Sequence, residues 1–254
     1  LRNALESRQF ILHYQPQVAC KDGRVLRAEA LIRWQHPVKG VIAPVNFIPI
    51  AEQSGLIHQI TLWVVGEAVR ACARWRRSGL SLGVAVNLSA RSIGVSDLPI
   101  SIENSLVNSG LQPDRLTLEL TESAVMSDPN RAIDVMTRLK ALGISLSIDD
   151  FGTGYSSMAY LKQLPVDELK IDRSFVLDMV NQPNDRIIVR AVIDLAHNMG
   201  LSAVAEGVET QDAWNLLRSW KCDLAQGYLL ARPLPETAFL EWLERFRTES
   251  TSLV

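Results

Sequence analysis

Cysteine and histidine are scarce in this 254-residue chain, and their spacing argues against a zinc site or a disulfide framework. The three cysteines, Cys20, Cys72 and Cys222, are far apart and form no CxxC pair. We therefore expect buried free thiols in a reducing compartment. The four histidines show neither HxxxH nor HExxH spacing, in which two histidines share one helix face to bind zinc. A zinc centre is not expected.

The chain also lacks an excess of basic residues, a long hydrophobic run and a visible signal peptide. It has 26 Lys and Arg against 28 Asp and Glu, so no surface for polymeric nucleic acid is expected. The apolar stretch ITLWVVG stops at Glu67, far short of the ~20 residues that span a bilayer. We expect a cytoplasmic domain without membrane contact of its own. Because the chain begins at Leu1 rather than Met, we expect one domain, 1–254, from a longer protein that could be membrane-anchored.

Short apolar runs that end in a polar residue recur along the chain. Runs of three or four apolar residues are typical of buried parallel strands, and strand–helix units at this interval predict an α/β fold, the (β/α)8 or TIM barrel. The chain length matches that fold, which takes roughly 250 residues. Since barrel active sites gather at the C-terminal strand ends, the polar residues predict an enzyme site. They are Glu29, Asn87, Glu119, Asp149, Lys170, Glu206 and Gln226.

The first strand is expected to break the parallel pattern. FILHYQPQV has strand character, and Asp22-Gly23 predicts a tight turn into the strand that contains Glu29. A tight turn joins antiparallel neighbours, because a parallel pair needs a crossover of a dozen or more residues. The predicted fold is therefore a modified TIM barrel with an antiparallel first strand.

Helix signals are clearest in the middle of the chain. A long loop rich in Pro and Gly is expected over 36–57, before a helix near Ile60–Arg77. Asp128 is expected to cap a helix that begins at Pro129 and ends at Gly143. Near 184–200 an apolar stripe predicts the buried face of another helix. The stripe consists of Ile187, Ile188, Ala191, Val192, Leu195, Ala196 and Met199.

Several acids converging on one pocket would repel one another and retain protons unless a cation held them. Oxygen-only side chains suit Mg²⁺ or Mn²⁺ rather than zinc. The adjacent Asp149 and Asp150 could serve two ions about 3.5–4 Å apart. The candidate ligands are Glu29, Asn87, Glu119, Asp149 and Asp150. The alternative is that each acid pairs with an Arg or Lys from a neighbouring helix.

Seven ordered motifs covering almost the whole chain resemble the signatures of EAL-domain cyclic di-GMP phosphodiesterases. The resemblance implies a modified TIM barrel of bacterial origin that hydrolyses cyclic di-GMP to linear 5′-pGpG in second-messenger signalling. It also implies a homodimer and two divalent ions, Mg²⁺ or Mn²⁺, with Ca²⁺ inhibitory. The motifs are EALIRW, NLS at Asn87–Ser89, LELTES, SIDDFGTGYSS, LKIDRSF, AEGVET and QGYLLARPLP.

The resemblance also implies roles for individual residues. Lys170 is similar to a lysine that touches the attacking water, and Glu206 to a residue that is a metal ligand or a general base. Arg33 resembles a phosphate contact, and Glu209 and Gln226 resemble substrate-facing or supporting groups. The implied metal ligands are Glu29, Asn87, Glu119, Asp149, Asp150 and Glu206. Supporting residues are Glu122, Asp172, which is expected to steady Lys170, and Gly152, Thr153 and Gly154 in the loop Phe151–Ser157. Glu122 is expected to hold this loop by accepting hydrogen bonds from Thr153, Ser156 or backbone amides.

Three other functions were weighed against hydrolysis. A receptor that binds cyclic di-GMP without cutting it would keep Arg33 but lose metal ligands, and none is missing here. A class I aldolase would use Lys170 as a Schiff-base nucleophile, which requires a neutral amine. Flanking carboxylates such as Asp172 would instead keep Lys170 charged. A structural role without a site is the remaining alternative.

Overall fold

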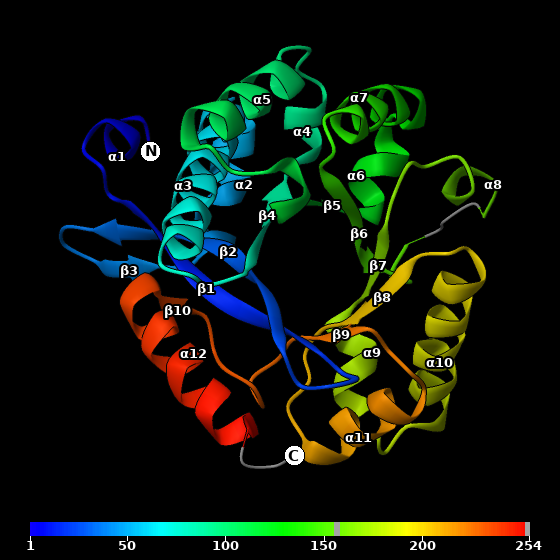
Figure 1. The fold of residues 1–254 in the computed structure, drawn as a ribbon. Coiled ribbons are helices and arrows are strands. Elements are labelled where there is room, and N and C mark those ends of the chain that lie inside the picture. Colours follow the sequence, from blue (N-terminus) through cyan, green and yellow to red (C-terminus); the bar gives the residue numbers. More distant parts are fainter. Residues whose placement is uncertain (155–157, 252–254) are drawn as a thin grey trace.

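The computed structural model describes residues 1–154 and 158–251, within which eight strands close into a barrel ringed by helices (Figure 1). Seven strands run parallel around the barrel in the order β2, β4, β5, β6, β7, β8 and β9, and β1 closes it antiparallel to both β2 and β9. The modified TIM barrel and its reversed first strand are therefore confirmed. The barrel strands are β1 (Phe10–Ala19), β2 (Val25–His36), β4 (Gly83–Leu88), β5 (Leu116–Thr121), β6 (Ser145–Phe151), β7 (Glu168–Ile171), β8 (Ser202–Ala205) and β9 (Leu224–Ala225).

The reversal of β1 follows from the turn between the first two strands. Gly23 has φ +71°, a left-handed conformation that glycine adopts without strain. Its backbone N–H donates to the carbonyl of Ala19 at 2.9 Å, which closes the turn. So short a connection places β2 beside β1 in the opposite direction.

Helices cover the outside of the barrel, and several begin where the sequence predicts. Asp128 caps α7 by accepting a hydrogen bond from the backbone N–H of Arg131 at 3.2 Å, with Pro129 as the first helical residue. The helices are α1 (Arg2–Glu6), α2 (Ile48–Gln53), α3 (Ile57–Arg77), α4 (Ala90–Ile93), α5 (Leu98–Ser109), α6 (Glu122–Ser127), α7 (Pro129–Ala141), α8 (Met158–Leu161), α9 (Arg173–Asp178), α10 (Pro183–Asn198), α11 (Gln211–Ser219) and α12 (Glu236–Thr251), with 3-10 turns at Pro44–Asn46 and Pro113–Arg115 and short strands β3 (Gly40–Ile42) and β10 (Leu234–Pro235).

One local prediction was wrong and another was correct only in part. The expected long loop over 36–57 contains β3, a 3-10 turn and α2, because β2 continues past the barrel and pairs with β3 in a hairpin. In the predicted stripe on α10, Val192 and Ala196 are buried, but Ile187 is 66% exposed. Val189 and Ile193, which lie outside the stripe, are buried as well. Both apolar sets have helical spacing, so only packing on the barrel distinguishes them.

The described residues contain no helix that is both long and apolar enough to cross a bilayer. All three cysteines are buried and unbridged, as expected. Strand alternation points one face of every strand into the barrel. On several strands that inward face carries polar residues. These inward side chains form the candidate site.

Candidate functional site

The seven polar residues predicted at strand ends converge at the C-terminal end of the barrel. Glu206 and Gln226 come directly after β8 and β9, and the others lie on β2, β4, β5, β6 and β7. Glu29 was wrongly predicted to end a strand: it lies inside β2, which continues to His36. Glu29 still reaches the site, because Ala30 is the last residue of β2 that pairs with β4. The barrel part of β2 therefore ends beside Glu29, whose side chain faces the interior. We call these seven residues the upper cluster.

Lys170 is the fully buried centre of the upper cluster. Its Nζ lies 2.6 Å from Glu206, 2.8 Å from Glu119 and 3.1 Å from Asp149. Burial alone would lower the pKa of Lys170, but the surrounding carboxylates raise it well above its ordinary value. The ammonium is therefore held charged. This environment opposes Schiff-base chemistry, which needs a neutral amine.

Glu29 is held by two amide side chains. Asn87 Nδ2 donates to one of its oxygens at 2.6 Å, and Gln226 Nε2 donates to the other at 2.6 Å. Burial would raise the pKa of Glu29, but Lys170 and these two hydrogen bonds hold it below its ordinary value. Glu29 is thus kept ionised, as a metal ligand must be.

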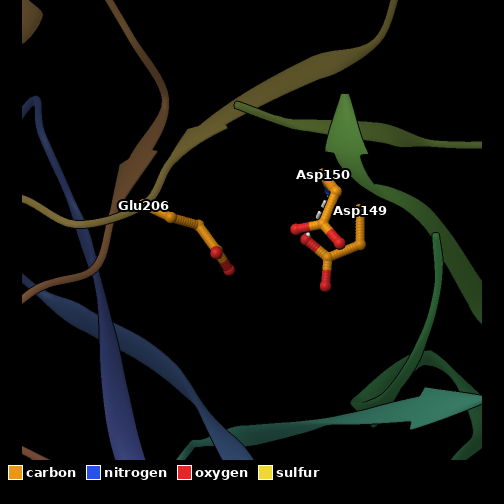
Figure 2. Close-up of side chains that lie close together, drawn as sticks. All are labelled: Asp149, Asp150 and Glu206. Atoms are coloured by element: carbon orange, nitrogen blue, oxygen red, sulfur yellow. Dashed lines mark hydrogen bonds between the residues drawn. The ribbon is translucent and has the colours of Figure 1, made fainter. Parts of the chain in front are cut away.

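A second set of acids lies where the barrel opens. Figure 2 shows Glu206 extending from the end of β8 toward Asp149 and Asp150 at the end of β6. A carboxylate oxygen from each lies within 4.8 Å of the others. Burial raises the pKa of Glu206 to about 8, and burial with neighbouring Asp149 and Asp172 raises that of Asp150 to about 6. Asp150 has φ +54°, a conformation that costs non-glycine residues energy.

These donors fit a divalent cation. Burial, together with Glu29, Asp149 and Glu206, also raises the pKa of Glu119 well above normal, against the pull of Lys170. The carboxylates around Lys170 outnumber its single positive charge, so added positive charge would lower their mutual repulsion. The donors are oxygens, which suits Mg²⁺ or Mn²⁺. Asp149, Asp150 and Glu206 can therefore hold a metal ion. The alternative, that each acid pairs with a cation from a neighbouring helix, fails for Glu119, Asp149 and Glu206, because their partner is Lys170 on β7.

The raised pKa values predict that the metal-free protein loses stability as pH rises. The pKa of the Glu206 carboxyl rises from its ordinary 4.5 to about 8 in the folded protein. Between these values the folded state binds more protons than the unfolded chain, so the free energy of unfolding falls as pH rises. Mg²⁺ competes with protons for these oxygens. We expect Mg²⁺ to raise the melting temperature more at pH 8 than at pH 5.5.

Thermal melting with EDTA or Mg²⁺ at several pH values measures this effect. Glu206→Gln should flatten the metal-free pH dependence, because it removes the group with a pKa of about 8. An Mg²⁺ effect of equal size at both pH values would contradict the prediction.

Glu122 anchors the loop that follows the two aspartates. Its Oε2 accepts a hydrogen bond from the backbone N–H of Gly152 at 3.0 Å, as expected for an acid that steadies the loop. A Cβ at Gly154 would lie 2.8 Å from Glu122 Oε1, so a larger residue there would push against the Glu122 carboxylate. Thr153 donates instead to the carbonyl of Asp150 at 2.9 Å. The predicted contact from Ser156, like the rest of 155–157, lies outside the described residues.

Asp172 does not steady Lys170 as predicted. It caps α9, where it accepts a hydrogen bond from the backbone N–H of Ser174 at 2.9 Å. Its charge also raises the pKa of Asp150. Asp172 lies two residues after Lys170, but β7 ends at Ile171 and the chain turns there into α9, so Asp172 caps that helix instead of continuing the inward face of the strand.

Two cavities open beside the upper cluster and meet at Leu31. One of about 200 Å³ is lined by Glu29, Glu206, Glu209 and Gln226, which places Glu209 and Gln226 where a ligand could reach them. The second, of about 420 Å³, is mostly apolar; its lining includes Pro44, Ile48, Glu52, Asn87 and Thr121.

Arg33 lies further along β2 from Glu29. Its guanidinium donates to the carbonyl of Ile32 at 2.8 Å and interacts electrostatically with Glu29 and Tyr228. Arg33 is therefore close enough to the upper cluster to act with it.

The sequence analysis missed several residues of the site. Arg173 and Tyr228 line the smaller cavity, and both lie inside motifs that were noted for other residues. Gln17 and Arg27 lie deeper in the barrel and contact the upper cluster directly or through one another. Arg27 lies two residues before Glu29, so alternation along one strand face could have revealed it.

The sequence model of one protein family, the EAL domain, matches residues 1–233 of the chain. The chain belongs to the EAL domain family. This EAL domain is 45% identical over 94% of its length to the bifunctional diguanylate cyclase/cyclic di-GMP phosphodiesterase MucR of Pseudomonas aeruginosa. It is 39% identical over 97% of its length to the cyclic di-GMP phosphodiesterase PdeR of Escherichia coli. It covers 35% and 37% of those proteins, so it spans about a third of the curated relatives' length.

Solved structures agree with this assignment. The EAL domain superposes with a TM-score of 0.90 on the phosphodiesterase PaMucR in a c-di-GMP complex, with 45% identity and 94% and 97% of the two chains covered. It superposes with a TM-score of 0.84 on the FimX EAL domain from Pseudomonas aeruginosa bound to c-di-GMP, with 26% identity and 92% and 94% coverage. The modified barrel is therefore the fold of the family.

Proposed function

We propose that this EAL domain is a metal-dependent phosphodiesterase that hydrolyses cyclic di-GMP to linear 5′-pGpG. The observation that carries the proposal is the intact upper cluster, in which Lys170 and four carboxylates converge beside two cavities. The names of the relatives and the c-di-GMP complexes of similar structures supply the substrate.

Two divalent ions would neutralise the phosphodiester, lower the pKa of a bound water and stabilise the departing oxygen. Asp149, Asp150 and Glu206 would hold one of them, and Glu29, Asn87 and Glu119 would complete the other site with Asp149. Gln226 keeps Glu29 in place through its 2.6 Å hydrogen bond.

Lys170 and Glu206 would act on the attacking water. The Lys170 ammonium is charged and buried, so it can orient the water and offset negative charge that develops in the transition state. Glu206 has a pKa of about 8 in the metal-free protein, so if it does not bind metal it could accept a proton at mildly alkaline pH, where it is ionised.

The cavities suit an extended dinucleotide with two phosphates. Arg173, which lines the smaller cavity, and Arg33 supply positive charge for phosphate oxygens. Tyr228 lies under the Arg232 guanidinium at 4.1 Å, which fixes the aromatic ring at the edge of the same cavity. The larger apolar cavity could accept a flat base.

Incubation of the purified domain with cyclic di-GMP tests the proposal, with products resolved by chromatography. We expect 5′-pGpG with Mg²⁺ or Mn²⁺ and no product in EDTA. Ca²⁺ should support binding but poor turnover, because it prefers more ligands at longer distances. Equal rates in EDTA and Mg²⁺ would overturn the metal-dependent mechanism, and tight binding without turnover in any metal would instead indicate a receptor.

Glu122→Ala should weaken the apparent Mg²⁺ affinity by about 10-fold, because supporting partners of metal ligands typically contribute 10–100-fold. The variant loses the acceptor for Gly152 N–H, and the loop adjoins Asp150. Titration of turnover with Mg²⁺ measures the affinity, and high Mg²⁺ should restore part of the rate. Glu241→Ala, on the exposed face of α12, is the control. Wild-type Mg²⁺ dependence in Glu122→Ala would show that the loop has no influence on the metal site.

Homodimerisation, cytoplasmic location and the absence of membrane contact stay predictions. Sedimentation velocity at several concentrations, with and without cyclic di-GMP, tests the first of these directly.

A further inference from the structure

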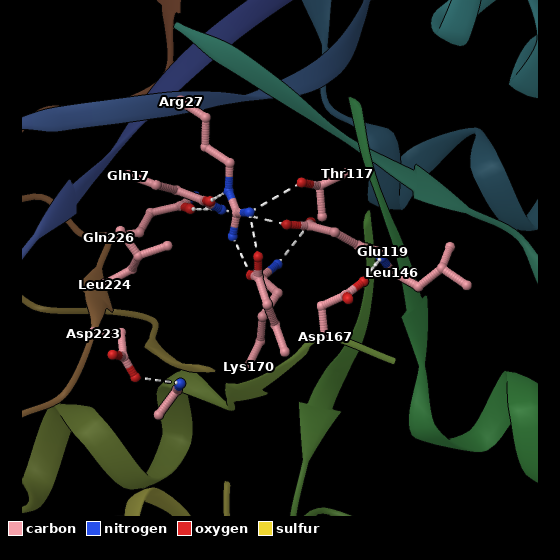
Figure 3. A network of polar contacts seen from close by, with 12 residues as sticks. Gln17, Arg27, Thr117, Glu119, Leu146, Asp167, Lys170, Asp223, Leu224 and Gln226 are labelled. Carbon is pink, nitrogen blue, oxygen red and sulfur yellow. Dashed lines mark hydrogen bonds and ion pairs between the residues drawn. The ribbon is translucent and has the colours of Figure 1, made fainter. Parts of the chain in front are cut away.

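A second layer of polar side chains lies below the upper cluster, deeper in the barrel. Three of its members lie two residues before members of the upper cluster on the same strands, so alternation points them inward as well, and the fourth, Gln17, lies on β1. Arg27 precedes Glu29, Thr117 precedes Glu119, and Glu168 precedes Lys170. We call Gln17, Arg27, Thr117 and Glu168 the lower layer. Figure 3 shows the Arg27 guanidinium between Gln17 and Thr117, with Glu119 and Gln226 close by.

Arg27 is the centre of the lower layer. Its guanidinium donates to both carboxylate oxygens of Glu168, to Thr117 Oγ1 at 3.0 Å and, through Nε, to Gln17 Oε1. Arg27 and Glu168 are 8% and 7% exposed, respectively. Because Glu168 binds two of the nitrogens as a fork, the Nε–H has a fixed direction.

That fixed direction determines how the Gln17 amide is turned. Arginine can only donate hydrogen bonds, so Gln17 must present Oε1 to it. The Gln17 Nε2 group then faces the opposite way, where it donates to Glu119 Oε1 at 3.3 Å and to Gln226 Oε1 at 2.8 Å.

The same constraint passes to the next amide. Since Gln226 Oε1 accepts from Gln17, its Nε2 must face Glu29, to which it donates at 2.6 Å, and Gln15 Oε1, to which it donates at 2.9 Å. If Gln17 turned over, its carbonyl oxygen would face the Glu119 carboxylate and the Gln226 oxygen. Three acceptors would then meet without a donor in a buried place.

We propose that Arg27 is a positioning residue, which acts through Gln17 and Gln226 to hold Glu119 and Glu29 in the orientation needed for metal binding. The effect of Arg27 on catalysis rests on the proposed function. The hydrogen bonds from Arg27 to Gln17 and from Gln17 to Gln226 do not depend on that function. Glu168 serves as the clamp that fixes Arg27, and the two lie on β2 and β7, which are not neighbours in the sheet.

The double variant Arg27→Met/Glu168→Met tests the proposal without leaving an unpaired buried charge. Replacing a buried ion pair by apolar residues of similar volume often leaves stability unchanged. We expect a melting temperature close to wild type, but Mn²⁺ affinity about 10–100-fold weaker, by calorimetry in the absence of substrate. At saturating Mn²⁺ the loss in turnover should fall on kcat, with KM for cyclic di-GMP little changed.

Gln17→Leu interrupts the same chain of amides one step later. It should weaken Mn²⁺ affinity to a similar degree, and adding it to the double variant should cause no further loss, because Arg27 acts through Gln17. Arg27→Lys keeps the charge beside Glu168 but lacks a fixed donor for Gln17, so it should resemble the double variant.

Wild-type Mn²⁺ affinity in either the double variant or Arg27→Lys would overturn the proposal. So would additive losses on combining Gln17→Leu with the double variant. Because Mn²⁺ binding is measured without substrate, a wild-type protein that binds Mn²⁺ but does not hydrolyse cyclic di-GMP would contradict the proposed function alone.

Discussion

Asp149→Ala should abolish turnover, with a loss of about 10³-fold or more in kcat. The expected size follows from the several kcal/mol that a bound metal ion contributes to the transition state, at about 1.4 kcal/mol for each tenfold. Asp149 contacts Lys170 at 3.1 Å and lies in the cluster with Asp150 and Glu206. The proposed function places it at both metal ions, so its loss should affect both.

Asp149→Asn separates this role from folding, since it preserves the size of the side chain and removes its charge. The isosteric variant should also lose turnover while keeping its melting temperature in EDTA, and calorimetry should show weaker Mg²⁺ binding. Asp194→Asn, which affects an exposed ion pair with Arg190 on α10, is the matched control. If Asp149→Asn unfolds at a much lower temperature than wild type, the pair with Lys170 is chiefly structural.

Glu29→Ala and Asn87→Ala should behave like Asp149→Ala. Glu29 is 5% exposed and accepts hydrogen bonds from two amides, so its removal leaves Asn87 and Gln226 without their acceptor. Glu29→Gln is the better variant for separating charge from packing. Retained turnover in Glu29→Gln would remove Glu29 from the metal site.

Lys170→Ala should lower kcat by about 10²–10⁴, the usual scale for a positioned proton-transfer group. The variant removes the buried ammonium from between Glu119, Asp149 and Glu206. Without it these acids repel one another and retain protons at higher pH, so the pH at which activity is half-maximal should also rise. Substrate binding in Ca²⁺ should change far less than kcat.

A pH–rate profile of Lys170→Ala at saturating Mg²⁺ measures both effects. Lys140→Ala is the control, because Lys140 forms an ion pair with Asp167 at 2.8 Å outside the upper cluster. An unchanged kcat in Lys170→Ala would exclude Lys170 from the mechanism.

The balance of charge explains why this barrel can hold so many acids. Lys170 neutralises part of the upper cluster, and the amides of Asn87 and Gln226 satisfy Glu29. Burial first, and the neighbouring acids second, raise the pKa values of Asp150 and Glu206 to about 6 and about 8, so keeping both ionised is costly without added positive charge. A divalent cation is expected at that place.

The sequence by itself determined the barrel, its reversed first strand and the upper cluster. These depend on local signals: apolar runs that end in polar residues, the short turn at Gly23, and seven ordered motifs. A residue at the end of an inward strand face lies at the barrel mouth regardless of its neighbours, so Asn87, Glu119, Asp149, Lys170, Glu206 and Gln226 could be placed without a structure.

Only the tertiary structure decided which residues face each other across the barrel. Arg27 and Glu168 are 141 residues apart and meet because the stagger of the strands on closure brings β2 and β7 to the same depth. The same holds for Asp172, whose motif gave no indication that it caps α9 instead of contacting Lys170. Alternation within a strand shows which side chains point inward, but the stagger that pairs them is set only when all eight strands close.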